Sequence, residues 1–387
     1  MYNIQTLNKI SDKGLKLFGQ GYNLDDNHSD PDAILVRSTK MHDMEFGDSL
    51  MAIARAGAGT NNIPIDECTE KGIVVFNTPG ANANAVKELV VAGLLLSSRK
   101  ITSGMEWVQS LDGGQDVAKS IEKAKSQFAG PELAGKTIGV IGLGAIGVMV
   151  ANAAYSLGMD VIGYDPYISV HAAFGVSRHI NYTESIDEVL SCADYISIHV
   201  PLMDDTAKMF NKEVFAKVKP GLRLLNFSRA GLVDNEDVKE AIDKGQVSYY
   251  VTDFPTEDLL GNDRIIAIPH LGASTPESEE NCAVMAVNQT KDYLENGNIV
   301  NSVNFPHCEM AWNTNWRIAI MHKNVPKMVS QITSALAKEH INIMDMMNKS
   351  AGDWAYTIID TSTKIACEAL PELEKIDGII RMRFFSK

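Results

Sequence analysis

Short apolar segments alternate with amphipathic segments through most of the chain. Many of the apolar ones are rich in β-branched residues and apolar on both faces, as strands buried in a parallel sheet are. The predicted strands are Ala33–Val36, Ile73–Phe76, Thr137–Ile141, Val161–Tyr164, Tyr195–Val200, Leu222–Phe227, Val247–Val251 and Ile265–Ile268. Between them, stretches such as Glu236–Lys244 have helical periodicity, and Gly245 ends that helix. This alternation predicts an α/β fold built on parallel sheets.

Two longer segments are predicted to be helices near domain boundaries. Val86–Lys100 is largely apolar and ends in a polar run, whereas Thr275–Asn296 is amphipathic. Thr275 suits the N-cap of the second helix, acidic residues follow in its first turn, and Gly297 ends it. The chain over residues 301–315 is polar and irregular, which predicts a linker.

The last segment, residues 316–387, has a different order of elements. Strand, helix, strand, strand, helix and strand are predicted at Ile318–Met321, Lys327–Glu339, Ile341–Met347, Ala355–Asp360, Ala366–Glu374 and Ile379–Phe384. A βαββαβ unit of this length is enough for a small independent domain.

Composition places the chain among ordinary globular proteins. Its 387 residues exceed what one hydrophobic core usually fills, and 45% of them are apolar and 22% charged. The net charge of −14 argues against nucleic acid or an anionic membrane as the main partner. The five cysteines are odd in number and dispersed, so neither a disulfide framework nor a metal site is expected. Because no signal peptide and no membrane-spanning apolar run appears, we expect a cytoplasmic protein.

A glycine-rich loop follows the predicted strand Thr137–Ile141. The loop reads Gly142-Leu-Gly144-Ala-Ile-Gly147 and leads into an apolar helix, and a second strand ends at Asp165. In a dinucleotide-binding motif the first glycine makes the tight turn, the second admits the pyrophosphate, and the third lets helix and strand pack closely. Asp165 would accept both ribose hydroxyls and repel a 2′-phosphate, so the expected cofactor is NAD rather than NADP.

Three candidate catalytic residues follow predicted strands, at the edge where open α/β sheets place ligands. Arg229 follows Leu222–Phe227, Glu257 follows Val247–Val251, and His270 follows Ile265–Ile268. A histidine backed by a carboxylate can take a hydroxyl proton near neutral pH, and an arginine can hold a carboxylate substrate. Each residue alone is more simply a surface charge, but together they favour oxidation of a 2-hydroxy acid. His199 ends an apolar strand, so we expect it to be packed rather than reactive.

These motifs resemble those of the D-isomer-specific 2-hydroxyacid dehydrogenase family over essentially the whole chain. They are Arg37-Ser38, Arg55-Ala-Gly57-Ala-Gly59, Asn77-Thr-Pro-Gly80, Glu132-Leu-Ala-Gly-Lys136, Asn226-Phe-Ser-Arg229, Phe254-Pro-Thr-Glu257 and Pro269-His-Leu-Gly-Ala-Ser274. The resemblance implies two Rossmann-like or flavodoxin-like parallel-sheet domains. One is a discontinuous substrate-binding domain, residues 1–97 and 275–305, and the other is an NAD-binding Rossmann domain, residues 98–274.

The resemblance also implies roles for individual residues. Arg229, Glu257 and His270 would form the catalytic set. The expected substrate contacts are Arg37, which would grip a phosphate, and Ser38, Gly57, Ala58 and Gly59. The expected cofactor contacts are Thr78, Gly142, Gly144, Ala145, Ile146, Gly147, Asp165, Val200, Pro201, Phe227, Ser228, Arg229, Thr252, Asp253, His270, Gly272 and Ala273.

The chain departs from the family pattern at one of these cofactor positions. Relatives usually carry Asp-Val-Phe ahead of the catalytic glutamate, and that aspartate contacts the nicotinamide amide. Here Thr252 takes the aligned position and the acid is displaced to Asp253. Either Asp253 substitutes through a shifted backbone, or Thr252 bonds the amide itself.

Residues 316–387 resemble an ACT domain, a small regulatory module. His322, Asn324 and Asn342 match positions that bind L-serine in regulated relatives, whereas Lys327 replaces a usual glycine. The resemblance therefore leaves two readings open. Either the domain binds L-serine as an effector, or it only dimerises through its sheet edge.

The appended domain and Arg37 favour one reaction within the family. It is the NAD-dependent oxidation of 3-phospho-D-glycerate to 3-phosphohydroxypyruvate, the first step of L-serine biosynthesis. An alternative is a reductase of hydroxypyruvate, glyoxylate or another 2-oxo acid. A third possibility, a nucleotide-sensing scaffold like the corepressor relatives of the family, fits an acidic chain poorly. The expected partners are a small phosphorylated 2-hydroxy acid and further copies of the chain, in a homodimer or homotetramer.

Overall fold

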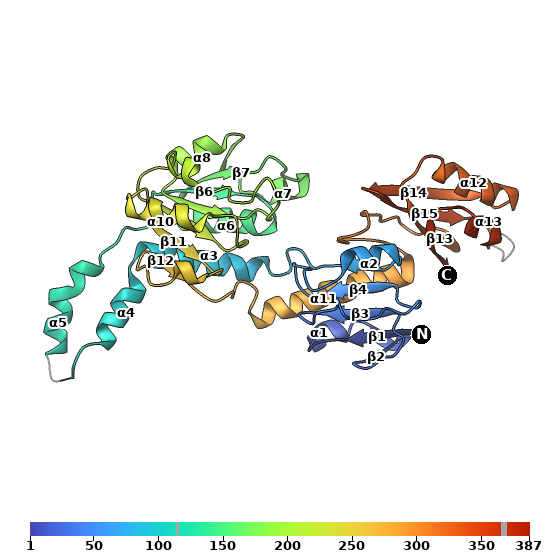
Figure 1. The fold of residues 1–387 in the computed structure, drawn as a ribbon, viewed down its shortest axis with the longest axis horizontal. Helices are drawn as coiled ribbons and strands as arrows, with labels where there is room; N and C mark the ends of the chain where they lie inside the picture. Colours follow the sequence, from blue (N-terminus) through green and yellow to red (C-terminus); the bar gives the residue numbers. More distant parts are fainter. Residues whose placement is uncertain (114–115, 365–369) are drawn as a thin grey trace. The chain divides into compact units, whose positions relative to one another are not determined.

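The computed structural model describes residues 1–113, 116–364 and 370–387, and it divides the chain into two compact units. Unit 1 comprises Met1–Asn82 and Glu279–Lys387, and unit 2 comprises Ala83–Ser278. Figure 1 shows their helices and strands. In the described residues, no helix is both long enough and apolar enough to cross a membrane.

Unit 2 is built on a seven-stranded parallel sheet with the order β12-β11-β10-β9-β6-β7-β8. The strands are β6 (Thr137–Ile141), β7 (Asp160–Tyr164), β8 (Asn181–Thr183), β9 (Tyr195–Ile198), β10 (Leu222–Asn226), β11 (Val247–Thr252) and β12 (Ile265–Ala267). The chain leaves the centre of this sheet in both directions, from β6 to β7 and then back to β9. Such a switch point opens a crevice at the carboxyl ends of the strands, where ligands bind in α/β folds.

The helices of unit 2 either precede β6 or connect the strands. They are α3 (Ala83–Ser98), α4 (Ile101–Gln109), α5 (Val117–Ala124), α6 (Ala145–Ser156), α7 (Val170–Gly175), α8 (Ile186–Cys192), α9 (Lys212–Phe215) and α10 (Asn235–Asp243), with short 3₁₀ turns at η2 (Lys125–Phe128) and η3 (Glu257–Leu259). Within this unit α4 and α5 extend away from the sheet (Figure 1). Buried side chains of α3, α6 and the strands form one continuous core.

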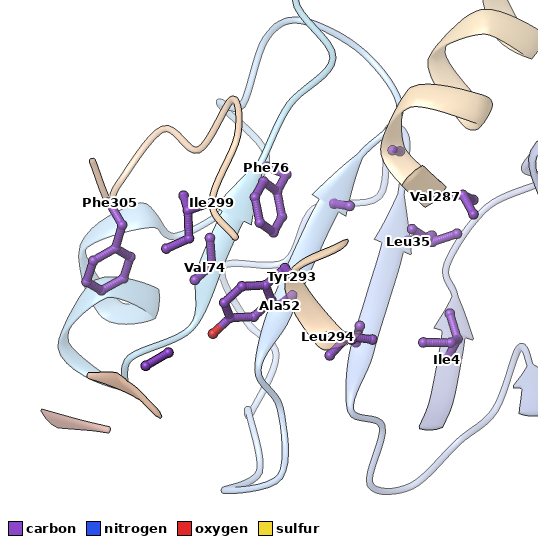
Figure 2. Packing of buried hydrophobic residues seen from close by; sticks show 14 of the residues in the cluster. Ile4, Leu35, Ala52, Val74, Phe76, Val287, Tyr293, Leu294, Ile299 and Phe305 are labelled. Atoms are coloured by element: carbon purple, nitrogen blue, oxygen red, sulfur yellow. The ribbon is translucent and has the colours of Figure 1, made fainter. Parts of the chain in front are cut away.

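Unit 1 contains a five-stranded parallel sheet with the order β2-β1-β3-β4-β5. Its strands are β1 (Tyr2–Thr6), β2 (Tyr22–Asp25), β3 (Ala33–Val36), β4 (Ala52–Arg55) and β5 (Val74–Phe76), and its helices are α1 (Asp12–Leu15), η1 (Gly19–Gly21), α2 (Ile65–Glu70) and most of α11 (Pro276–Asn296). Figure 2 shows apolar residues of α11, such as Val287 and Tyr293, against the sheet. Thr275 caps α11, since its Oγ1 accepts from the Ser278 amide at 3.1 Å, as the sequence predicts.

A second, antiparallel sheet completes unit 1, with the order β14-β15-β13-β16. It comprises β13 (Trp316–Lys323), β14 (Ile343–Ala351), β15 (Trp354–Thr361) and β16 (Ile379–Ser386), with α12 (Met328–Lys338) and α13 (Leu370–Glu374). The predicted βαββαβ order is confirmed, although residues 365–369 of the predicted helix Ala366–Glu374 lie outside the described residues. One face of the sheet packs on α12 and α13.

The other face of this sheet belongs to the core of unit 1. Ala319, Met321, Tyr356, Ile358 and Phe385 lie in the same buried cluster as residues of the parallel sheet and α11. Three side chains of the antiparallel sheet also bond the carboxyl end of α11. Arg383 donates to the carbonyls of Tyr293 and Leu294 at 2.8 Å, Arg317 to that of Asn296 at 3.0 Å, and the Tyr356 hydroxyl to that of Gly297 at 2.7 Å. These bonds satisfy carbonyls that a helix end leaves without intrahelical partners.

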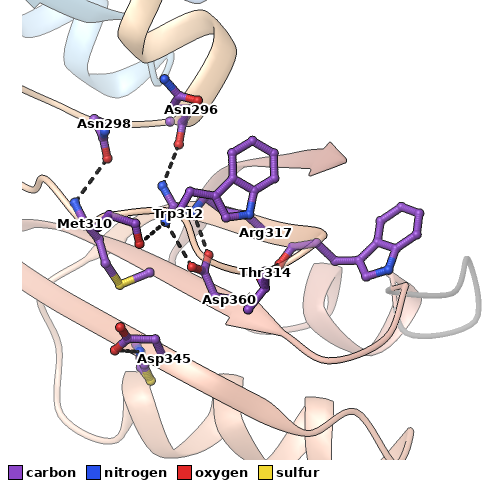
Figure 3. A network of polar contacts seen from close by, with 12 residues as sticks. Asn296, Asn298, Met310, Trp312, Thr314, Arg317, Asp345 and Asp360 are labelled. Carbon is purple, nitrogen blue, oxygen red and sulfur yellow. Dashed lines mark hydrogen bonds and ion pairs between the residues drawn. The ribbon is translucent and has the colours of Figure 1, made fainter. Parts of the chain in front are cut away.

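The division into units differs from the sequence expectation in three places. Residues 83–97 and 275–278, expected in the substrate domain (1–97 and 275–305), belong to unit 2, and residues 316–387, expected to stand alone, belong to unit 1. The predicted linker is packed as well, because Phe305, Cys308 and Met310 are buried. Figure 3 shows this segment around Arg317, which pairs with Asp360 at 2.6 Å and donates to the Ala311 carbonyl.

Candidate functional site

The glycine loop of unit 2 lies between β6 and α6. Gly142 has φ +91°, and a Cβ built there would meet the His199 carbonyl oxygen at 2.5 Å. A Cβ at Gly147 would meet the Gly142 oxygen at 1.9 Å, so this glycine is required for close packing of helix and strand. A Cβ at Gly144 would meet nothing within 4 Å. The second glycine therefore faces open space, as a pyrophosphate-binding position requires.

The helix start at this loop has no side-chain cap for its first amides. Gly144 is the N-cap of α6 and offers no side chain to bond them. A helix N-terminus in this state favours a phosphate, through both its N–H groups and its dipole. The local geometry thus fits a dinucleotide.

Asp165, just after β7, is fixed against the same loop. Its Oδ2 accepts from the Leu143 amide at 2.8 Å and its Oδ1 from the Tyr167 amide at 2.8 Å. Each carboxylate oxygen has a further lone pair. The structure therefore holds Asp165 beside the loop while it can still accept from two hydroxyls.

The loops after β9 and β10 are tied to each other. The Ser228 hydroxyl donates to the Val200 carbonyl at 2.7 Å, and Asn226 donates to the Arg229 carbonyl at 3.0 Å. The Arg229 side chain is exposed and donates to the Ser228 carbonyl at 2.8 Å. Asn226, buried at the end of β10, fixes the backbone that presents Arg229, a supporting role that the sequence prediction did not include.

The three predicted catalytic residues follow β10, β11 and β12, which are neighbours in the sheet. Glu257 begins η3 and is exposed, and the exposed His270 ring lies 4.7 Å from the Phe254 ring. Among the contacts of the described residues, no hydrogen bond or ion pair joins Glu257 to His270. That predicted pair stays a prediction.

Asp253 and Thr252 are both buried, but their side chains differ in hydrogen bonding. The Thr252 hydroxyl already accepts from the Phe254 amide at 3.1 Å. The Asp253 side chain is 1% exposed, and neither of its oxygens has a hydrogen-bond partner among the residues that the structure describes. Burial raises the pKa of Asp253, and the nearby charge of His270 opposes that rise. Gly272 lies against this carboxylate, with a built Cβ 3.4 Å from Oδ2.

His199 is packed, as the sequence predicts. Its Nε2 lies 2.8 Å from the Ser197 hydroxyl, and burial lowers its pKa to about 3. An imidazole that cannot be protonated near neutral pH is a poor candidate for an acid or a base.

The predicted substrate residues all belong to unit 1. The amides of Arg37, Ser38 and Thr39 donate to one atom, Oδ1 of Asn8, at 2.9–3.1 Å. Asn8 was not identified from the sequence, because its role depends on the fold bringing two distant loops together. The Arg37 guanidinium forms an ion pair with Glu279 at 2.7 Å.

The Arg55 side chain supports the loop of Gly57, Ala58 and Gly59. Built Cβ atoms at Gly57 and Gly59 would lie 3.0 and 3.3 Å from Nη1 of Arg55, whose Nε donates to the Arg37 carbonyl at 3.0 Å. Arg55 stands within a recognised motif, but its own role was not predicted. Thr78 is fully buried, and its amide donates to the Gly57 carbonyl at 3.1 Å. Within the described part of the chain, its hydroxyl has no hydrogen-bond partner.

The predicted effector residues lie on and beside the antiparallel sheet. His322 is buried, with Nε2 2.8 Å from the Thr357 hydroxyl and Nδ1 2.9 Å from the Lys323 carbonyl. Asn324 donates to the Gly352 carbonyl, and Asn342 is exposed. Lys327 has φ +70°, a left-handed conformation that glycine adopts at lower cost. Both ring nitrogens of His322 are therefore engaged within the protein.

Comparison with known proteins identifies relatives of both units. Residues 91–272 match the model of the D-isomer specific 2-hydroxyacid dehydrogenase NAD binding domain. A D-3-phosphoglycerate dehydrogenase of Haemophilus influenzae is 30% identical over 88% of this chain and 82% of its own length. One of Synechocystis is 36% identical over 71% of this chain and 49% of its length, and one of Methanocaldococcus jannaschii is 37% identical over 52% of its length. The chain thus spans about half the length of the last two.

Solved structures show the same fold. An NAD⁺-bound 3-phosphoglycerate dehydrogenase of Entamoeba histolytica superposes with a TM-score of 0.61 and 27% identity, covering 78% of this chain and 98% of its own. A D-mandelate dehydrogenase of Rhodotorula graminis gives a TM-score of 0.67 at 18% identity, covering 80% of this chain and 99% of its own. The second similarity concerns the fold alone.

Proposed function

Because the chain belongs to the D-isomer-specific 2-hydroxyacid dehydrogenase family, we propose that it oxidises 3-phospho-D-glycerate to 3-phosphohydroxypyruvate with NAD⁺. The observation that carries the cofactor part is the open space above Gly144 at the uncapped start of α6. The names of the relatives in H. influenzae, Synechocystis and E. histolytica support the substrate.

The cofactor would lie along the carboxyl ends of the strands of unit 2. The loop from Gly142 to Gly147, including Ala145 and Ile146, would hold the pyrophosphate, and Asp165 would accept from the ribose hydroxyls. The nicotinamide end would be contacted by Thr78, Val200, Pro201, Phe227, Ser228, Arg229, Thr252, Asp253, His270, Gly272 and Ala273. Bound NAD⁺ supplies the acceptor for the hydride that leaves C2 of the substrate.

The residues of this chain would accept the proton from the substrate and stabilise the charges that form during the reaction. An imidazole nitrogen of His270 takes the C2 hydroxyl proton, and the Glu257 carboxylate stabilises the imidazolium that forms. Arg229 holds the substrate carboxylate and polarises the C2 oxygen. Ser38 and the loop of Gly57, Ala58 and Gly59 would contact the carboxylate, and Arg37, with Arg55 behind it, would hold the phosphate.

A purified-protein assay tests this proposal. We expect NAD⁺ reduction with 3-phospho-D-glycerate but little with D-glycerate, since only the first offers a phosphate to Arg37. NAD⁺ should outperform NADP⁺ by at least roughly tenfold, about 1.4 kcal/mol, because of Asp165. Equal use of both cofactors would contradict the role of Asp165.

A second candidate activity is reduction of hydroxypyruvate, glyoxylate or another 2-oxo acid. The ion pair between Arg37 and Glu279 favours it, since this arginine already has an anionic partner within the chain. Faster NADH oxidation with hydroxypyruvate than NAD⁺ reduction with 3-phospho-D-glycerate, each at saturation, would support the reductase and contradict the first proposal.

We further propose that residues 316–387 form an ACT-like regulatory domain and that the enzyme is a homodimer or homotetramer in the cytoplasm. The βαββαβ order supports the domain assignment. Exposed apolar side chains on α4 and α5, including Met105 and Val108, support self-association. L-Serine remains the candidate effector, and its inhibition of the assay above is the direct test.

A further inference from the structure

The Arg37–Glu279 ion pair joins the end of β3 to the first turn of α11. Nη1 of Arg37 lies 2.7 Å from Oε1 of Glu279, and the two side chains are 40% and 45% exposed. Glu279 is also the first residue of unit 1 after the chain leaves unit 2 at Ser278. The carboxylate therefore contacts the very guanidinium that the proposed function assigns to the substrate phosphate.

The first three backbone amides of this loop are already bonded within the protein. The three N–H groups from Arg37 to Thr39 all donate to Asn8. Recognition of an anion at the end of β3 thus depends on side chains, above all the Arg37 guanidinium. Arg55 lies on the neighbouring strand β4, and its Nε donates to the Arg37 carbonyl.

We propose that Glu279 is an internal ligand of Arg37 that competes with the substrate phosphate and so sets the affinity for phosphorylated substrates; this inference rests on the proposed function. Carboxylate and phosphate oxygens accept the same guanidinium N–H groups. If Glu279 stays in place, its charge repels the incoming phosphate. If Glu279 moves away, its ion pair with Arg37 is lost. Either way, binding of the phosphate is weakened by the carboxylate.

Glu280 offers a matched control on the same turn of α11. It is similarly exposed and forms its own ion pair with Lys13, at 2.9 Å. Neutralising Glu280 changes the net charge of the protein by the same amount as neutralising Glu279, but it leaves Arg37 paired. A difference between the two variants therefore reports the contact with Arg37 and not the overall charge.

The experiment measures inorganic phosphate binding to the full-length protein by calorimetry, together with KM for 3-phospho-D-glycerate. We expect Glu279→Gln to tighten phosphate binding and lower KM by roughly two- to fivefold, the range for one exposed ion pair. Glu280→Gln should match the wild type. Arg37→Ala should abolish the gain, so that Arg37→Ala/Glu279→Gln binds phosphate no better than Arg37→Ala. Melting temperatures near that of the wild type verify that each variant is folded.

Two results would overturn the proposal. One is weaker or unchanged phosphate binding in Glu279→Gln, which would make Glu279 a support for Arg37. The other is an equal gain in both glutamine variants. If the wild type turns over 3-phospho-D-glycerate while either result is found, this inference alone fails. If the wild type neither binds phosphate nor turns over 3-phospho-D-glycerate, the proposed function fails with it.

Discussion

At the scale of single residues, Asp253 is the most unusual group in unit 2. Its carboxylate is 1% exposed and has no hydrogen-bond partner in the described ranges of the chain. Such a group is costly, and such groups concentrate where a ligand or a reaction uses them. The sequence left open whether Asp253 or Thr252 meets the nicotinamide amide. Since the Thr252 hydroxyl already accepts from the Phe254 amide, Asp253 is the better candidate.

The raised pKa of Asp253 predicts a pH-dependent gain of stability in Asp253→Asn. The folded protein holds this proton more tightly than the unfolded chain does. The contribution of Asp253 to stability therefore falls as pH rises above about 3.9, the ordinary aspartate pKa, through the raised folded value. Without cofactor, Asp253→Asn should therefore melt higher than the wild type at pH 8, and the difference should shrink toward pH 4.5. Thermal melts across this range test it; a variant that is less stable at pH 8 would contradict it.

His270 yields a second prediction at this scale. His270→Ala should lower kcat by about 10²–10⁴, because proton transfer to a positioned base is lost. The dissociation constant for NAD⁺, measured by calorimetry, should change little. His171→Ala, at an exposed position outside every motif, serves as the control and should retain full activity. Equal activity of the two variants would remove His270 from the mechanism.

At the scale of elements, the β6–loop–α6 segment could be predicted well because its requirements are local. Strand, glycines and helix are neighbours in sequence, and the positive φ of Gly142 follows from the turn itself. Asn8 and Glu279 could not be predicted in this way. Their partners are the loop after β3 in each case, and only the complete fold brings them to it.

The glycine loop separates a packing role from a binding role. Gly147→Ala should destabilise unit 2 and weaken NAD⁺ binding, since a Cβ would lie 1.9 Å from the Gly142 oxygen. Gly144→Ala should fold normally, with a melting temperature near that of the wild type, because its Cβ meets nothing within 4 Å. It should nevertheless lose NAD⁺ affinity at least roughly tenfold if the pyrophosphate approaches there. Calorimetry on both variants distinguishes the two roles.

At the scale of the whole molecule, residues 301–387 pack into unit 1 more closely than their composition indicates. The polar composition of residues 301–315 indicated a linker, but a few apolar side chains, Phe305, Cys308 and Met310, are enough to bury that segment. The sheet of residues 316–387 is buried on both faces: one face packs on its own helices, and the other packs in the core of unit 1. Periodicity within a strand does not reveal which protein surface covers the second face.

Substitutions in the buried pair of Arg317 and Asp360 test how strongly the packing of residues 316–387 stabilises unit 1. Arg317→Met should lower the free energy of unfolding by about 3–5 kcal/mol, because it leaves a buried carboxylate without its partner. It also removes the bonds to the Asn296 and Ala311 carbonyls. Urea denaturation measures the loss. The double variant Arg317→Met/Asp360→Leu should regain much of it, and no recovery would mean that the carbonyl bonds dominate.

The discontinuity of unit 1 has a consequence for synthesis on the ribosome. Residues 83–278 are contiguous, so unit 2 can fold as soon as it emerges. By contrast, β1 to β5 are made before unit 2 and need α11 and β13 to β16, which are completed after it. Such long-range closure slows folding and leaves apolar strands exposed meanwhile. The nascent chain would then carry an unfinished parallel sheet throughout the synthesis of unit 2, the interval in which a chaperone would have the most to protect.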